Sequence, residues 1–195
     1  MDATMIAGRA PTDTGGSACG RDSVHSAPMS RIVLRDLTKT FGDLAILDPL
    51  SLAIESGSFV SVIGPSGCGK TTLVRVIAGL EPATAGEVAV DGGSPRAARS
   101  HKRVAMVPQQ PGLLPWRTVY ENARLLLDVN RGANPPEATE PTALLHEVGL
   151  GDFLDAYPHE LSGGMQQRVA LVRALTLGAP LLVMDEPFAA LDEIT

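Results

Sequence analysis

A glycine-rich segment of eight residues has the composition and spacing to bind the phosphates of a nucleotide. It reads Gly64-Pro65-Ser66-Gly67-Cys68-Gly69-Lys70-Thr71 and fits the pattern G-x-x-x-x-G-K-[ST]. Its glycines permit backbone angles that turn successive N–H groups inward. Lys70 is then expected to bridge the β- and γ-phosphates, and the Thr71 hydroxyl to ligate Mg²⁺. The alternative is a glycine-rich turn with a chance Lys-Thr pair, but the segment stands between a predicted strand and a predicted helix, as this motif requires.

A second segment, Leu161-Ser162-Gly163-Gly164-Met165, also suits a phosphate. It precedes a predicted helix, so a row of backbone N–H groups and one hydroxyl are available to an anion. One nucleotide does not need two phosphate sites from one chain. We therefore expect the second segment to serve a nucleotide held by another copy of the protein.

Two adjacent acids follow an apolar run at residues 181–184. Buried carboxylates are costly unless a cation or strong hydrogen bonds compensate them, and the carboxyl end of a strand faces the ligand crevice of an open α/β sheet. Asp185 is expected to hold Mg²⁺ through its water shell, and Glu186 to orient or deprotonate the attacking water. The alternative is a solvated strand end with two ordinary acids, which the upstream phosphate loop disfavours.

Composition limits the class of protein. The 195 residues are 44% hydrophobic, enough for one α/β domain with a sizeable core. The 16 basic and 22 acidic residues give a net charge of -6, without the basic excess typical of nucleic-acid binding. No apolar run approaches the roughly 20 residues that span a bilayer. Cys68 lies inside the phosphate loop, where a disulfide is implausible, so a reducing cytoplasm fits.

The elements that position these segments follow from the hydrophobic pattern. Residues 1–28 are rich in small and polar residues without a period and are expected to form a disordered tail, with Met29 as a possible true start. The domain is expected over 29–195, with a helical subdomain at about 110–177. Strands are predicted at 32–34, 50–54, 58–63, 87–90, 103–107 and 180–184, and helices at 71–78, 119–129, 142–148 and 163–177.

Together these segments resemble the nucleotide-binding subunit of an ATP-binding-cassette (ABC) transporter. The resemblance covers residue 31 to the C-terminus, and its motifs stand in the family's order: the phosphate loop, a glutamine loop at Gln109, the signature at 161–165, the Walker B strand and acids at 181–186, and a D-loop at 190–192. It implies an α/β fold with a P-loop NTPase core, a parallel-rich sheet, an antiparallel β portion and a helical insert.

The resemblance also implies ATP and Mg²⁺ as ligands. Catalysis falls to Glu186, Lys70 and Gln109, and the metal to Thr71, Gln109 and Asp185. Phe41 matches the aromatic that stacks on adenine, although it could instead be a core aromatic. The residues expected at the nucleotide are Phe41, Gly64, Pro65, Ser66, Gly67, Cys68, Gly69, Lys70, Thr71, Thr72, Ser162, Gly163 and Gly164.

Gln109 is chosen over Gln110, or over a plain polar loop position, by its spacing to Leu113-Leu114-Pro115-Trp116. That segment, with Met165 and Pro187-Phe188, resembles bacterial importers of nitrate, sulfonates, taurine or related small ions. The family usually has Gln where this chain has Met165, and Met is familiar there in this importer group.

The resemblance further implies a head-to-tail homodimer. Each ATP would lie between the phosphate loop of one subunit and residues 162–164 of the other, and closure would drive two permease subunits. A groove near Gln109 would receive a short helix from each permease subunit. A solute-binding protein would act indirectly, no nucleic acid is expected, and the location would be the cytoplasmic face of the bacterial inner membrane, peripherally bound.

The family's C-terminal strands and switch histidine have no counterpart, since the sequence stops ten residues after Asp185. In the family one such strand lies between the phosphate-loop strand and the Walker B strand. Residues 1–195 alone are therefore expected to be poorly stable or inactive, because unpaired buried backbone groups cost about 1–3 kcal/mol each. Both a fragment of a longer subunit and a natural truncation fit.

Two other functions remain open. One is a truncated protein that binds nucleotide without hydrolysing it and acts as a regulator or a vestige. The other is a soluble relative acting on DNA or ribosomes, which the single cassette and the acidic balance disfavour.

Overall fold

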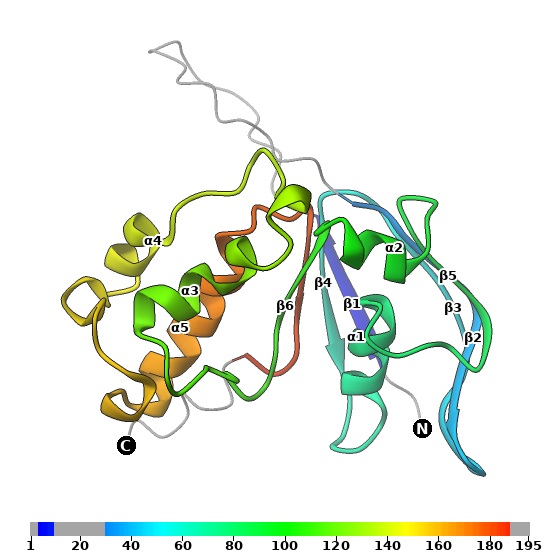
Figure 1. Ribbon diagram of the computed structural model, residues 1–195. Coiled ribbons are helices and arrows are strands. Elements are labelled where there is room, and N and C mark those ends of the chain that lie inside the picture. The colour runs from blue at the N-terminus through cyan, green and yellow to red at the C-terminus, as the bar shows by residue number, and fades with distance from the viewer. Residues whose placement is uncertain (1–3, 10–29, 188–195) are drawn as a thin grey trace, which may run out of the picture.

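The computed structural model describes residues 4–9 and 30–187. The chain has a half rich in β-strands, on the right of Figure 1, and a helical half on the left. Strands β6 (Val104–Val107) and β7 (Leu181–Met184) lie between them, and the segments that leave β6 and enter β7 connect the two halves. None of the helices in these described residues combines the length and the apolar character needed to cross a bilayer.

An antiparallel sheet covers the outer side of the strand-rich half. It consists of β2 (Ile32–Phe41), β3 (Leu44–Ile54) and β5 (Ala85–Val90), in the order β3-β2-β5. Gly42 and Asp43 form a tight turn between β2 and β3, and Gly42 has a φ of 57°, which glycine adopts without strain. This sheet is the predicted antiparallel portion, and both of its hairpin strands are longer than the sequence pattern indicated.

The phosphate-loop strand β4 (Ser58–Ile63) pairs with β1 (Thr4–Arg9) in an antiparallel register of six residue pairs. The expectation of a disordered tail over 1–28 is therefore wrong for residues 4–9, because the backbone of this segment pairs with a strand far along the chain, with Thr4 opposite Ile63 and Arg9 opposite Ser58. The rest of that tail lies outside the described residues.

The parallel part of the structure is the pair β6 (Val104–Val107) and β7 (Leu181–Met184). Within the described ranges β4 is not hydrogen-bonded to β7, so the strands form three separate sheets, and the parallel content is smaller than expected. Helix α1 (Lys70–Ile77) packs its apolar side against the antiparallel sheet, where Leu34 and Leu37 meet Leu73 and Val76 in a buried cluster.

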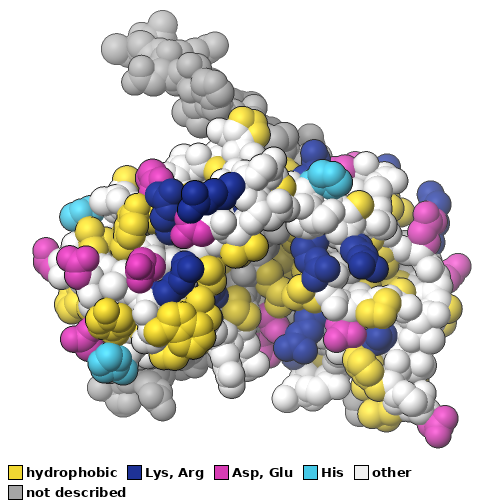
Figure 2. Space-filling model, in the orientation of Figure 1, with side chains coloured by type: hydrophobic (Ala, Val, Ile, Leu, Met, Phe, Trp, Pro, Cys, Tyr) yellow, Lys and Arg dark blue, Asp and Glu magenta, His cyan; other side chains and the backbone are white. Residues whose placement is uncertain are grey.

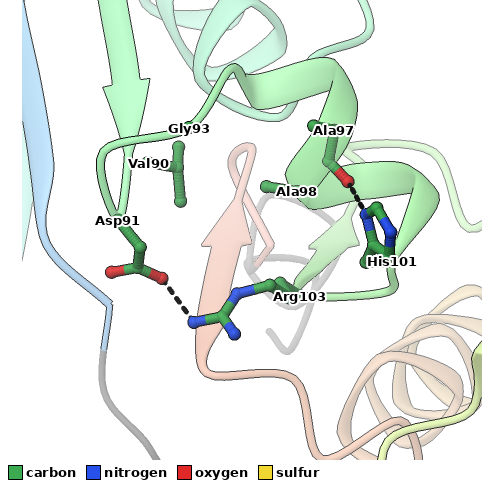
Figure 3. Close-up of a pocket in the computed structure, with 7 residues that line it drawn as sticks. All are labelled: Val90, Asp91, Gly93, Ala97, Ala98, His101 and Arg103. Carbon is green, nitrogen blue, oxygen red and sulfur yellow. Dashed lines mark hydrogen bonds and ion pairs between the residues drawn. The ribbon is translucent and has the colours of Figure 1, made fainter.

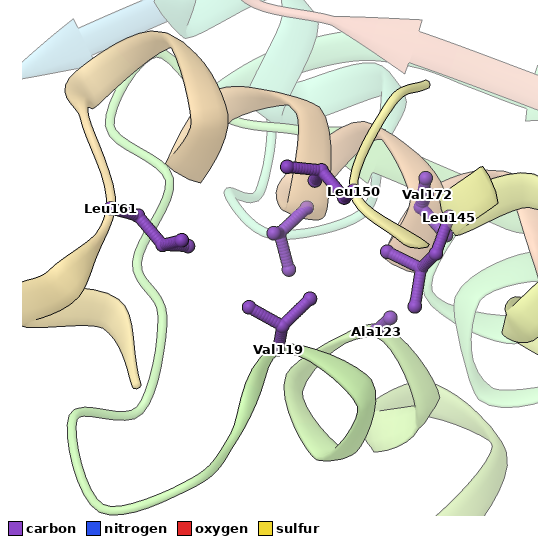
Figure 4. Close-up of a cluster of buried hydrophobic side chains, with 7 residues drawn as sticks. Val119, Ala123, Leu145, Leu150, Leu161 and Val172 are labelled. Atoms are coloured by element: carbon purple, nitrogen blue, oxygen red, sulfur yellow. The ribbon is translucent and has the colours of Figure 1, made fainter. Parts of the chain in front are cut away.

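Helices fill the stretch between β6 and β7. They are α3 (Val119–Asp128), α4 (Pro141–Glu147) and α5 (Gly163–Leu175), with short 3-10 turns at Arg131–Ala133, Gly151–Phe153 and Pro158–Glu160. Thr118 and Glu121 form a capping box at the start of α3. Figure 4 shows Val119 and Ala123 of α3 facing Leu145, Leu150, Leu161 and Val172 in the apolar core of this half.

One helix was missed from the sequence. Helix α2 (Pro95–Ser100) follows β5, and its first turn is capped by the Ser94 side chain, which accepts a hydrogen bond from the Ala97 N–H. Ser followed by Pro is a helix-start signal, because Ser caps the first turn and Pro tolerates the first helical position. The helix has only six residues, too few to show a period.

Candidate nucleotide-binding site

The phosphate loop connects β4 to α1, as its sequence pattern requires. β4 ends at Ile63 and α1 begins at Lys70. Gly67 and Gly69 have φ values of 79° and 94°, a left-handed region that favours glycine. A Cβ added to Gly69 would lie 2.8 Å from Leu47 Cδ2 and 2.9 Å from the Ile46 carbonyl oxygen, so the loop presses against β3. Gly67 is therefore favoured by its backbone angle alone, and Gly69 by both backbone angle and space.

Lys70 folds back over the loop that precedes it. Its Nζ donates hydrogen bonds to the carbonyl oxygens of Gly64 and Pro65, both at 2.9 Å. The same Nζ lies 4.0 Å from Glu186 Oε1. The ammonium is thus held at the mouth of the loop, between its carbonyls and a carboxylate from the end of β7.

Thr71 and Asp185 meet beneath the loop. The Thr71 hydroxyl donates to Asp185 Oδ1 at 2.8 Å, and Asp185 is only 4% exposed. Two hard oxygen donors at one point, one of them a buried carboxylate, fit Mg²⁺, which is usually bound by one or two carboxylates and completes its shell with waters and phosphates. In the part of the chain that the structure describes, no group of three or more His, Cys, Asp or Glu side chains could hold a metal ion.

Glu186 and Gln109 complete the cluster. Gln109 Nε2 donates to Glu186 Oε2 at 2.9 Å. The two residues come together because β6 and β7 run parallel and both end at this edge, where the Asp185 N–H donates to the Val107 carbonyl at 2.9 Å. Glu186 has a φ of 45°, a conformation uncommon outside glycine that clusters at functional sites.

Phe41 lies at the end of β2 and is 49% exposed, so it is not a core aromatic. The Lys39 ammonium sits 4.5 Å from the centroid of its ring. Lys39 pairs in register with Leu47, the residue that Gly69 approaches, which places this end of the hairpin beside the phosphate loop. An exposed aromatic in this position is compatible with the expected stacking on adenine, which stays a prediction.

Lys39 is a residue that the sequence reading did not single out. It is 6% exposed, donates to the Pro82 carbonyl at 2.9 Å and lies 3.5 Å from Glu81 Oε2. Its spacing of two from Phe41 on a strand was the available signal, since residues i and i+2 share a face.

The signature segment is not brought to the phosphate loop of its own chain. Ser162 caps α5, its Oγ accepting a hydrogen bond from the Met165 N–H at 3.3 Å, and Gly163 and Gly164 are the first helical residues. Figure 1 shows the start of α5 in the helical half, well to the left of the loop that follows β4. The structure therefore separates the two phosphate-binding segments predicted from the sequence.

The other predicted nucleotide contacts lie where the motif places them. Those between β4 and α1, or in the first turn of α1, are Pro65, Ser66, Cys68 and Thr72. The predicted D-loop at 190–192 and Phe188 lie outside the described residues.

A separate cavity of about 340 Å³ lies between β5, α2 and the start of β6. Figure 3 shows Asp91 and Arg103 paired at one side of it and His101 turned toward the Ala97 carbonyl. Burial acts to raise the pKa of Asp91, but hydrogen bonds from Ser30, Arg31 and Arg103 outweigh it and hold that pKa below its usual value. The charged groups that line the cavity, Asp91 and Arg103, pair with each other, so we assign the cavity a structural role.

Comparison with known proteins agrees with this geometry. Residues 47–189 match the ABC transporter family. The chain is 46% identical to an aliphatic sulfonates import ATP-binding protein of Frankia alni, over 86% of this chain and 62% of the relative. It is 42% identical to a spermidine/putrescine import ATP-binding protein of Chromobacterium violaceum, over 84% of this chain and 46% of the relative.

A solved structure described as an ATP binding subunit of an ABC transporter shares the fold. The TM-score is 0.64 at 26% identity, and the match covers 82% of this chain and 67% of that one. The predicted α/β P-loop fold is thereby confirmed. The chain spans less than two thirds of the length of the two import proteins. Over the part that is matched, the chain belongs to the ABC transporter family.

Proposed function

We propose that this chain binds and hydrolyses ATP as the ATP-binding subunit of an importer for a small organic solute. The observation that carries the proposal is the convergence of Lys70, Gln109 and Glu186 with the Thr71–Asp185 pair at one edge of the sheet. These residues come from three distant stretches of the sequence, and each has the chemistry that phosphoryl transfer needs.

Each residue of the site has a proposed role, and Gln109 has two. Lys70 and the inward N–H groups of the loop bind the β- and γ-phosphates, and Phe41 stacks on the adenine. Thr71 and Asp185 hold Mg²⁺, with Gln109 as a further ligand. When bound, the ion would neutralise charge that develops on the phosphate oxygens. Glu186 orients the attacking water and accepts its proton, and Gln109 holds the carboxylate of Glu186 by the 2.9 Å hydrogen bond.

The functional unit is proposed to be a homodimer. The signature at 162–164 presents a helix N-terminus and a hydroxyl, yet lies away from the phosphate loop of its own chain. A head-to-tail dimer would bring the signature of one subunit against the ATP of the other. The incomplete cis site is what supports this arrangement.

Permease subunits are the proposed membrane partners, contacting the chain near Gln109. Trp116, seven residues further on, is 70% exposed, and tryptophan is among the residues enriched at protein–protein interfaces. We therefore place the chain peripherally at the cytoplasmic face of the inner membrane, with a solute-binding protein acting through the permease. On the face drawn in Figure 2, both basic and acidic side chains occur on each half, and the net charge of the chain is -6, which gives no support to nucleic-acid binding.

The transported solute is proposed to be a sulfonate, taurine, nitrate or a similar small ion. The Leu-Leu-Pro-Trp segment at 113–116 and Met165 support this group. The two relatives are named for different substrates, aliphatic sulfonates in one and spermidine or putrescine in the other. We therefore propose that the choice of transported solute depends on the permease encoded with this chain.

A substitution at Glu186 tests the hydrolysis. The full chain should bind a fluorescent ATP analogue in the presence of Mg²⁺ and release phosphate. In Glu186→Gln, binding should persist while kcat falls by about 100-fold or more, the scale of a lost general base. Glu147→Gln, the same change at an exposed position at the end of α4, should leave both unchanged.

Two outcomes would overturn the proposal. Binding without turnover in the unsubstituted chain would favour the non-hydrolysing alternative, and turnover that is insensitive to Glu186→Gln would remove the assigned base. Turnover would also contradict the expectation that residues 1–195 alone are inactive. We expect turnover because the described residues of one chain already bring the proposed catalytic residues together.

A further inference from the structure

The loop that carries Gln109 is attached to helix α5 at both of its ends. Two buried side chains of α5, Gln167 and Arg173, donate hydrogen bonds to backbone carbonyls of residues 108, 111 and 112. Gln109 itself lies between these anchor points, and its amide reaches Glu186.

Arg173 makes the stronger attachment. Its Nη2 lies 2.6 Å from the Pro111 carbonyl and its Nη1 lies 3.1 Å from the Gly112 carbonyl, so one guanidinium spans two successive peptide groups. The residue is 8% exposed, and burial lowers the pKa of its guanidinium. Burying a cation costs free energy unless it is well hydrogen-bonded. The hydrogen bonds of Arg173 to the loop therefore argue against a role in packing alone.

Gln167 makes the second attachment and stands six residues before Arg173 on the helix. Its Nε2 donates to the Pro108 carbonyl at 3.3 Å, and the residue is 4% exposed. Its Oε1 is buried and has no hydrogen-bond partner among the residues that the structure describes. Exchanging the two amide atoms would place oxygen against oxygen at Pro108, so the carbonyl of the loop fixes the orientation of this side chain.

We propose that Arg173 and Gln167 are positioning residues, which tie the Gln109 loop to α5 so that the orientation of this helix sets where the Gln109 amide meets Glu186. The proposal rests on the proposed function, because it gives Gln109 its role in hydrolysis. The physical basis of the proposal is that α5 begins at Gly163, is capped by Ser162 and continues unbroken to Leu175. The signature residues at the start of α5 and the two side chains that contact the loop therefore belong to one rigid element.

A double-mutant cycle separates this role from general support of the fold. Arg173→Met should lower kcat by up to about 100-fold, the scale of a displaced catalytic group, with little change in the KM for ATP. In a Gln109→Ala background the same substitution should lower kcat by less than about 2-fold, because the group it positions is already gone. If the two effects multiply instead, Arg173 does not act through Gln109.

Arg168→Met is the matched control. Arg168 lies on the same helix and also donates to a backbone carbonyl, that of Val148 at 3.2 Å, but this carbonyl belongs to the segment after α4. Whatever effect Arg168→Met has on kcat should multiply with that of Gln109→Ala. Non-additivity at Arg168 as well would assign the coupling to the helix in general and overturn the specific role of Arg173.

Backbone NMR order parameters test the attachment without any hydrolysis. In Arg173→Met, the order parameters of the Gln109, Gln110 and Gly112 amides should fall from the rigid value of about 0.85 to about 0.6 or below, while those in the first two turns of α5 stay the same. Unchanged order parameters in the loop would overturn the proposal. If the full chain binds no ATP or does not turn over, the proposed function fails, whereas this measurement still decides whether the attachment exists.

Two further variants cover a failure of Arg173→Met to fold. Arg173→Lys keeps the charge but can no longer span two carbonyls in a fixed fork, and Gln167→Leu keeps the volume and removes the Pro108 contact. Both should show the same fall in the order parameters of residues 109–112 to a smaller extent. Order parameters equal to those of the unsubstituted chain in both variants would contradict the attachment.

Discussion

At the scale of single residues, the candidate site depends on backbone conformations that few residues adopt. Gly67, Gly69 and Glu186 all have positive φ values, and all three lie around Lys70. Strain at such positions persists only where the surroundings enforce it, so each is sensitive to substitution. The two glycines differ in one respect that can be measured, because only Gly69 is also crowded.

Alanine at these glycines should have unequal effects on stability. At Gly67 an added Cβ meets nothing within 4 Å, so Gly67→Ala should cost only the left-handed strain of about 1–2 kcal/mol. At Gly69 the Cβ overlaps Leu47 and Ile46, so Gly69→Ala should cost about 1–3 kcal/mol more. Denaturant unfolding without nucleotide measures the loss of stability in both variants. Equal losses would mean that β3 shifts to accommodate the added methyl group without a free-energy cost.

At the scale of elements, the start of β2, the end of β5 and the start of β6 are joined by one carboxylate. Asp91 accepts hydrogen bonds from the Ser30 hydroxyl at 2.7 Å and the Arg31 N–H at 2.8 Å, and pairs with Arg103 at 2.7 Å. Three chain segments that a sequence pattern treats separately are thus fastened at one corner of the antiparallel sheet.

The pH dependence of stability should reveal this junction. The pKa of Asp91 is lower in the folded chain than its ordinary 3.8, so its stabilising contribution is complete above that value and is lost as the pH falls through the folded-state pKa. At pH 7 Asp91→Asn should therefore unfold with roughly 0.5–1.5 kcal/mol less free energy than the unsubstituted chain, because solvent screens the exposed Asp91 carboxylate. Below about pH 4 the difference should shrink.

Denaturant unfolding from pH 7 to pH 3 measures that difference. Asp43→Asn, at an exposed turn position between β2 and β3, serves as the control and should show almost no difference at any pH. A deficit for Asp91→Asn that grows toward acid would have the wrong sign and would contradict the assignment.

At the scale of the whole molecule, one of the three sheets contains a strand, β1, that the sequence did not predict. Among the described residues, β1 is the hydrogen-bonded neighbour of β4, the strand that leads into the phosphate loop. The first residues of the chain therefore support the element on which nucleotide binding depends.

A chain that starts at Met29 should lose this support. Without β1, amide exchange at residues 58–63 should speed up, and the free energy of unfolding should fall by about 1–3 kcal/mol. Ile6→Pro in the full chain, which removes one donor opposite Ser61, should act in the same direction, whereas Ile6→Ala should preserve the pairing. Unchanged protection of β4 in both shortened and proline variants would show that β1 contributes nothing.

The sequence predicts this molecule well where a local pattern carries the information. The phosphate loop, β4, and helices α1, α3, α4 and α5 were predicted to within two residues, because glycine spacing and apolar periodicity are local. The pairing of β1, the hydrogen bond of Lys39 to the Pro82 carbonyl and the bonds of Arg173 to backbone carbonyls were not predicted. They join distant segments through backbone groups or a single side chain, which leave no periodic trace.

The exposed indole of Trp116 gives this protein an optical property of its own. The sequence contains a single tryptophan, and it stands four residues beyond the Gly112 carbonyl that Arg173 binds. All indole emission therefore originates at one surface point beside the Gln109 loop. Covering that point with another polypeptide would shift the emission toward the blue, so docking could be followed in real time without attaching a dye.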